Sequence, residues 1–204
     1  MSEIIENIHA YVKEEAKKRK YDWFLKNHVN IVARNAEYLL TQLPDANREV
    51  VMLSVWLHDI QRIQRPDMDH KHEETSAQLA MDIMQKHKVN PIIAAAVQKS
   101  ILSHSAKERI PESLEAKILS TADAMSHFTS DFFLALLVYD RRPEDTPEKF
   151  KNWALKKLDK DMNGGKMFFD FAKAKVRPEY ERLKDFFSSA LPDNLPQKEK
   201  VPTR

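Results

Sequence analysis

Apolar residues recur at intervals of three and four along most of the chain, which is the period of amphipathic helices. The clearest stripe lies in residues 22–43, at Leu25, Val29, Val32, Ala36, Leu39 and Leu43. Comparable stripes predict further helices over residues 1–21, 46–63, 73–86, 91–104, 111–125, 130–139, 147–161 and 165–190. No segment has the strict alternation of a strand, so the pattern predicts an all-α protein.

Proline, asparagine and glycine set several boundaries. Asn90–Pro91 combines a good N-cap with proline in the first turn of the next helix. Gly164 and Gly165 are the only glycines and interrupt the pattern before the last helix. Residues 64–70 (QRPDMDH) form a polar stretch that predicts a loop. The tail over 191–204 is polar and proline-rich, which predicts disorder.

Composition excludes several classes of function. The 204 residues carry 33 Lys and Arg against 31 Asp and Glu, and a net charge of +2 is too small to indicate nucleic-acid binding. The absence of cysteine excludes disulfides and thiolate metal sites, and fits a cytoplasmic location. Two glycines are too few for a glycine-rich phosphate loop. No stretch is apolar enough to predict a membrane span or a signal peptide.

Histidines and carboxylates lie on or beside the predicted apolar faces. His28, the pair His58–Asp59, His104 and Asp123 occupy such positions on four predicted helices. A single histidine on an apolar face is usually a satisfied core residue. Burying a carboxylate is costly unless it is paired or bound to a cation. Several such groups converging on one core therefore indicate a metal site.

The order of these residues resembles the HD superfamily of metal-dependent phosphohydrolases. The similar segments are NHVNIVARNAEYL, VWLHDI, HEETSAQLA, VQKSILSHS and LEAKILSTADAM, which together span about residues 22–125. The resemblance implies an HD-domain-like helical bundle with six metal ligands: His28, His58, Asp59, His72, His104 and Asp123. His70, two residues before His72, is an alternative ligand or a hydrogen-bond donor to one.

The resemblance leaves the number of ions open. Family members with one metal use the equivalents of His28, His58, Asp59 and Asp123. Members with two metals add the equivalents of His72 and His104, with the paired aspartate bridging both ions, although in some one-metal members these histidines contact substrate phosphate. Imidazole and carboxylate ligands suit manganese, iron, zinc or nickel better than calcium.

The resemblance also organises the chain into one domain. Residues 22–127 would be the metal-binding core, with the N-terminal helix over 1–21 packed on it. Extra C-terminal helices over 128–190 would complete the same domain and form part of the pocket wall. The sequence leaves a homo-oligomer open.

The implied activity is hydrolysis of a phosphate ester or anhydride, with a small phosphorylated molecule, in particular a nucleotide, as substrate. Asp59 would position the nucleophile, and Arg62 and Lys107 would bind phosphate, since each follows a ligand histidine by one helical turn. Other cations considered for this role are Arg65 and Lys99, and Asp67 or Asp69 would supply a further acid.

Two other functions fit the same ligands: a di-iron oxygenase of this fold, and a non-catalytic nucleotide-binding module. The remaining candidates have plainer interpretations. We expect Arg141–Arg142 and Lys156–Lys157 on solvated faces, and His9, His87 and His127 outside the site, on the surface or in the core. Trp23, Phe24 and Trp56 are expected to pack in the core rather than stack on a base.

Overall fold

The computed structural model describes residues 2–64, 72–140 and 146–189. These residues form helices and no strand, so the predicted all-α fold is confirmed. The elements are α1 (Glu3–Lys18), α2 (Asp22–Phe24), the π-helical turn η1 (Leu25–Val29), α3 (Asn30–Gln42), α4 (Arg48–Leu57), α5 (Ile60–Gln64), α6 (His72–Lys86), α7 (Pro91–Ser103), α8 (Leu114–Ser126), α9 (Ser130–Ala135), the π-helical turn η2 (Leu136–Asp140), α10 (Pro147–Asn163) and α11 (Asp170–Ser188).

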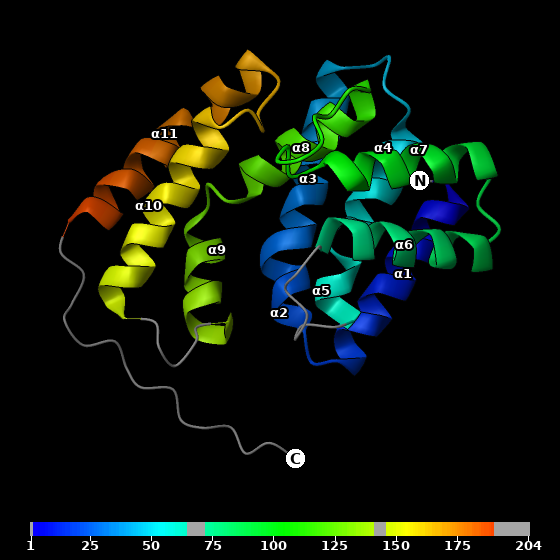
Figure 1. Ribbon diagram of the computed structural model, residues 1–204, viewed down its shortest axis with the longest axis horizontal. Coiled ribbons are helices and arrows are strands. Elements are labelled where there is room, and N and C mark those ends of the chain that lie inside the picture. The colour runs from blue at the N-terminus through cyan, green and yellow to red at the C-terminus, as the bar shows by residue number, and fades with distance from the viewer. Residues whose placement is uncertain (1, 65–71, 141–145, 190–204) are drawn as a thin grey trace.

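Helix α8 holds the two parts of the fold together. It packs on α3, α4 and α7 of the N-terminal part and also contacts α10 and α11. Helix α1 covers α4 and α5, and α6 packs along α7. In Figure 1, α10 and α11 lie side by side on one flank, and α9 lies between them and the N-terminal helices. The functional site lies between these two parts.

Two helices expected to be continuous are interrupted where polar site residues occur. Within residues 22–42, the turn Leu25–Val29 is π-helical and contains His28. Such turns insert one residue and are frequent at functional sites. Helix α4 ends at Leu57 and α5 begins at Ile60, which leaves His58 and Asp59 at the junction. The apolar period continues across this junction because Ile60 is fully buried, so periodicity could not reveal the break.

The last helix begins later than predicted, at Asp170 rather than near residue 165. Gly165 takes the left-handed region with φ +85°, which favours glycine. The chain then runs without helix along α8, where Ser120 Oγ donates to the carbonyl of Lys166 and Phe168 N–H donates to Thr121 Oγ1, both at 3.1 Å. These two hydrogen bonds hold Lys166 against α8.

Some predictions fall outside the described residues: the loop containing Arg65, Asp67, Asp69 and His70, the pair Arg141–Arg142, and the tail over 191–204. Within the described ranges, no helix combines the length and apolarity needed to cross a membrane.

Candidate metal centre

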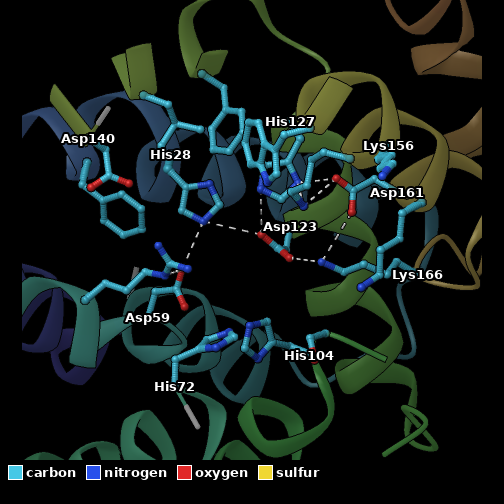
Figure 2. Close-up of a pocket in the computed structure, with 18 of the residues that line it drawn as sticks. His28, Asp59, His72, His104, Asp123, His127, Asp140, Lys156, Asp161 and Lys166 are labelled. Carbon is cyan, nitrogen blue, oxygen red and sulfur yellow. Dashed lines mark hydrogen bonds and ion pairs between the residues drawn. The ribbon is translucent and has the colours of Figure 1, made fainter. Parts of the chain in front are cut away.

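A cavity of about 990 Å³ opens between α10 and the N-terminal helices. Five of the six predicted ligands line it: His28, Asp59, His72, His104 and Asp123. His58, the sixth, is fully buried beside them. Figure 2 shows His28 pointing between Asp59 and Asp123, with His72 and His104 on the other side of Asp59. The fold therefore brings all six residues together from five parts of the chain.

The first group of ligand atoms surrounds His28 Nε2. This nitrogen lies 3.3 Å from His58 Nε2, 3.5 Å from Asp59 Oδ2 and 3.5 Å from Asp123 Oδ1. Two ligands that are each about 2.1 Å from one ion lie roughly 3.0–3.4 Å apart. The distances from His28 Nε2 are therefore close to those between two ligands of one ion. One ligand atom each from His28, His58 and Asp59 lies within 4.8 Å of the others, and the same holds for His28, Asp123 and His127.

Backbone carbonyls fix which nitrogen of two histidines faces the site. His58 Nδ1 lies 2.8 Å from the carbonyl oxygen of Val55, and His104 Nδ1 lies 2.7 Å from that of Ile101. A carbonyl only accepts hydrogen bonds, so each Nδ1 carries the proton. The Nε2 lone pair of each ring then remains available for a cation.

Ser126 fixes His28 in the same way. The Ser126 hydroxyl donates to the carbonyl of Asp123 at 2.7 Å, so its oxygen accepts the proton of His28 Nδ1 at 3.1 Å. The Nε2 atoms of His28 and His58 face each other at 3.3 Å. Two neutral rings in this arrangement point their Nε2 lone pairs at each other, and a cation between them relieves the repulsion. The donor set therefore fits a bound metal ion.

A second group of ligands joins Asp59 to His72 and His104. One ligand atom from each of the three lies within 4.8 Å of the others. Asp59 Oδ1 is buried and has no hydrogen-bond partner among the described residues. His72 Nδ1 lies 3.1 Å from Glu73 Oε2, which orients that ring. Since Asp59 belongs to both groups, its two oxygens can serve two ions.

The electrostatics of the site favour the protonation states that metal binding requires. Burial alone would raise the pKa of Asp59 and of Asp123, but His58 beside the first and Lys166 beside the second hold both well below the usual range. Burial lowers the pKa of His28, and burial together with His58 lowers that of His104 to about 4. The carboxylates are therefore charged and these two imidazoles neutral near pH 7.

Behind Asp123 lies a buried charge network that the sequence prediction missed. Lys166 Nζ is 2.5 Å from Asp123 Oδ2 and 3.8 Å from Asp161 Oδ1. Asp161 Oδ2 also lies 2.9 Å from His127 Nδ1 and 2.6 Å from Lys157 Nζ. His127 Nε2 is 3.6 Å from Asp123 Oδ1. His127, Lys157, Asp161 and Lys166 therefore form one network beside the carboxylate of Asp123.

The expectation for Lys157 was wrong: it is half-buried in this network, whereas Lys156 is exposed. The spacing of residues in the sequence could have indicated two members of this network, His127 and Asp161. His127 follows Asp123 by four, and Asp161 continues the buried stripe of Phe150, Ala154 and Leu158 on α10. Lys166 has no such signal, because it lies in a non-helical segment held by tertiary contacts.

Two of the predicted phosphate-binding cations line the cavity. Arg62 Nε lies 3.9 Å from Asp59 Oδ2, and Lys107 Nζ lies 3.9 Å from Glu73 Oε1. Lys99 is exposed and does not line the cavity, so the structure does not support that candidate.

Of the aromatic candidates, Phe24 is buried and lines the cavity. Trp56 is buried and stacks on His9, with ring centroids 3.9 Å apart. Trp23 stacks on Tyr139 in a separate pocket, with centroids 5.4 Å apart. Phe24 and Trp56 are buried in the core, as predicted, whereas Trp23 is partly buried and packs against the core from outside.

Comparisons with known proteins agree with this geometry. The family model described as HD domain matches residues 25–127. A crystal structure of a predicted HD superfamily hydrolase from an uncultured Thermotogales bacterium is similar, with a TM-score of 0.62 and 20% sequence identity over 90% of this chain and 88% of that one. At this identity the likeness supports the fold alone. No curated protein was found to match the chain.

Proposed function

The chain belongs to the HD domain family, and on this premise we propose that it is a metal-dependent hydrolase of phosphate ester or anhydride bonds, with nucleotides as its substrates. The observation that carries the proposal is the pair of facing Nε2 atoms of His28 and His58, 3.3 Å apart beside the charged Asp59 and Asp123. The similar crystal structure is described as a predicted hydrolase, which agrees with this reaction class.

We assign two divalent ions to the site. The first would be held by His28 together with His58, Asp59 and Asp123, whose nearest ligand atoms lie 3.3, 3.5 and 3.5 Å from His28 Nε2. The second would be held by Asp59, His72 and His104. This mixture of imidazole and carboxylate suits manganese, iron, zinc or nickel. Ions held there would supply Lewis acidity toward a phosphoryl oxygen and would activate water at neutral pH.

The chain's own groups then bind and orient the reactants. Arg62 and Lys107 both line the cavity and bind phosphoryl oxygens, and Asp59 orients the attacking water. The water oxygen forms a bond to phosphorus, and the P–O bond to the leaving group breaks. The attacking water gives up one proton to solvent, and the leaving oxygen keeps the electron pair and takes up a proton from solvent. Lys166 keeps Asp123 ionised and in place.

Hydrolysis by the full-length protein tests this proposal directly. The protein would be supplied with Mn²⁺ and incubated with p-nitrophenyl phosphate, bis(p-nitrophenyl) phosphate and a panel of nucleotides. We expect release of nitrophenol or phosphate that chelation abolishes and metal restores. Absence of cleavage from every substrate with each of manganese, iron, zinc and nickel would contradict the proposal.

Removal of the proposed phosphate-binding cations should weaken catalysis moderately. For Arg62→Gln and for Lys107→Gln we expect kcat/KM to fall roughly three- to tenfold, because each loses a charge-assisted hydrogen bond that is partly solvent-screened. The side chains are 35% and 52% exposed, which limits the effect. Steady-state kinetics would measure it. Lys99→Gln is the matched control, and an equal loss in that variant would exclude a local role.

Ser126 should affect metal affinity without touching the metal. In Ser126→Ala the His28 ring loses the acceptor that fixes its Nδ1 proton. We expect the metal dissociation constant to rise roughly 10–100-fold, the usual effect of removing such a partner. Competition with a chelator measures it. Ser54→Ala is the control, because Ser54 is buried on α4 and its hydroxyl has no partner among the described residues. Equal affinity in both variants would contradict the assigned tautomer.

A further inference from the structure

Helix α10 presents a second stripe of side chains to the cavity, apart from its buried stripe. Lys149, Trp153, Lys156 and Lys160 all line the cavity and follow one another at steps of four, three and four residues. Residues at these steps lie on one face of a helix. The stripe therefore extends roughly 16 Å along the cavity wall, since a helix rises about 1.5 Å per residue.

The lysines of this stripe differ from those that hold the metal ligands. Lys157 and Lys166 form ion pairs with Asp161 and Asp123. Lys156 and Lys160 form no ion pair with any described residue. They are therefore positive charges that face the cavity with their hydrogen-bonding capacity available.

One end of the stripe lies next to the proposed metal centre. Burial lowers the pKa of Lys160, and the nearby ammonium groups of Lys107 and Lys166 lower it further. Lys107 and Lys160 come from opposite sides of the cavity, so their charges converge there. Converging cations repel one another in the free protein, and an anion between them would relieve that repulsion.

Trp153 lies toward the other end, roughly 10 Å along the axis from Lys160. Its ring packs on Phe150, with centroids 5.7 Å apart, and on Phe133 at 6.0 Å. The side chain nevertheless remains 42% exposed and lines the cavity. A planar group that enters from the metal side can stack on such a ring.

We propose that α10 forms a subsite for the part of the substrate that is not hydrolysed: Lys156 and Lys160 bind an additional phosphate group, and Trp153 stacks on a base. The preferred substrates are then nucleotides that carry two or more phosphates, oriented with one phosphate at the metal centre and the base along α10. This inference rests on the proposed function for the phosphate at the metal centre, whereas the binding surface itself requires no catalysis.

Equilibrium binding to the metal-loaded protein tests the subsite. Trp153 is the tryptophan that lines this cavity, so its fluorescence reports on stacking. At constant free Mn²⁺ the protein would be titrated with adenosine mono-, di- and triphosphate. We expect quenching on binding, and a dissociation constant that falls roughly tenfold for each added phosphate, as expected for charge-assisted contacts.

Two variants separate the contribution of the lysines to phosphate binding from the contribution of Trp153 to base stacking. Lys156→Gln/Lys160→Gln should remove most of the dependence on phosphate number, and Trp153→Leu should abolish the quenching while retaining that dependence by calorimetry. Lys86→Gln/Lys99→Gln removes two exposed lysines outside the cavity and should behave as wild type. Equal affinity for the three nucleotides, or unchanged discrimination in the Lys156→Gln/Lys160→Gln variant, would overturn the inference.

Hydrolysis of p-nitrophenyl phosphate, measured in parallel, distinguishes the two proposals. Hydrolysis without discrimination by phosphate number would overturn the subsite and leave the proposed function in place. Discrimination and quenching without hydrolysis of p-nitrophenyl phosphate or of any nucleotide, with each of manganese, iron, zinc and nickel, would support the subsite and overturn the proposed function.

Discussion

Replacement of Asp59 by alanine is expected to lower kcat/KM for phosphate-bond hydrolysis on the order of a hundred- to a thousandfold or more. Asp59 Oδ2 belongs to the ligand group around His28, and Oδ1 is buried without a hydrogen-bond partner in the described chain. The variant therefore loses the carboxylate that would join both ions. Steady-state kinetics on p-nitrophenyl phosphate and on a nucleotide measures the effect.

Asp59→Asn is the sharper companion, because it keeps the shape of the side chain and removes the charge. We expect a comparable loss of hydrolysis and of metal affinity, since the amide is a poor ligand for these ions. Circular dichroism and thermal melting would show that both variants fold. Near-normal hydrolysis in a folded Asp59→Ala protein would remove this residue from the site.

Replacement of Asp161 by alanine is expected to lower the free energy of unfolding by about 3 kcal/mol, the typical cost of leaving buried charges unpaired. Asp161 is fully buried and contacts His127, Lys157 and Lys166. Its removal leaves the ammonium of Lys157 in the fold without its closest carboxylate. Urea denaturation of the metal-loaded protein, monitored by circular dichroism, measures the change.

Asp159→Ala is the matched control for this stability effect. Asp159 lies on the same helix, is exposed, and accepts one hydrogen bond from Asn163 Nδ2 at 2.8 Å. We expect a change within about 0.5 kcal/mol, as is usual for surface positions. Asp161→Asn should fall between the two, because the amide oxygen still accepts a hydrogen bond from Lys157. A similar stability in all three variants would show that the network contributes little.

The helical fold and five of the six candidate ligands could be located from the sequence for one physical reason, whereas His72 was proposed only from the family resemblance. Polar residues such as His58 and Asp123 interrupt apolar faces that otherwise follow the helical period. Burying such groups is costly, so their positions are informative even before any contact is known. The His-Asp pair at the end of a strongly apolar helix gave the sharpest signal.

The breaks in helical geometry that orient the side chains of the candidate ligands could not be predicted. The π-helical turn at Leu25–Val29 and the junction at His58–Asp59 preserve the burial of the flanking apolar residues. Periodicity therefore continues through both. What changes is the direction of His28 and Asp59, which depends on hydrogen bonds to other helices, such as that from His28 to Ser126.

The helices over 128–190 were expected to form part of the pocket wall, but the individual residues that they contribute could not be predicted. Lysines on a helix such as α10 usually face solvent, and Lys157 and Lys160 have no local feature that distinguishes them from surface residues. Only the packing of α10 against α8 turns them toward the cavity. The family match ends at residue 127, whereas Asp161 and Lys166 follow it, so the network behind Asp123 is contributed by the part of the chain outside that match.

The most direct test of the central claim is the metal content of the full-length protein, determined by elemental analysis after purification without chelators and with phosphate release assayed on the same sample. We predict about two equivalents of transition metal per chain, phosphate release that follows the metal content, and loss of both in Asp59→Ala. A protein that takes up no metal under any supplementation would contradict the site. Bound iron with oxygen consumption and no phosphate release would contradict the proposed hydrolase.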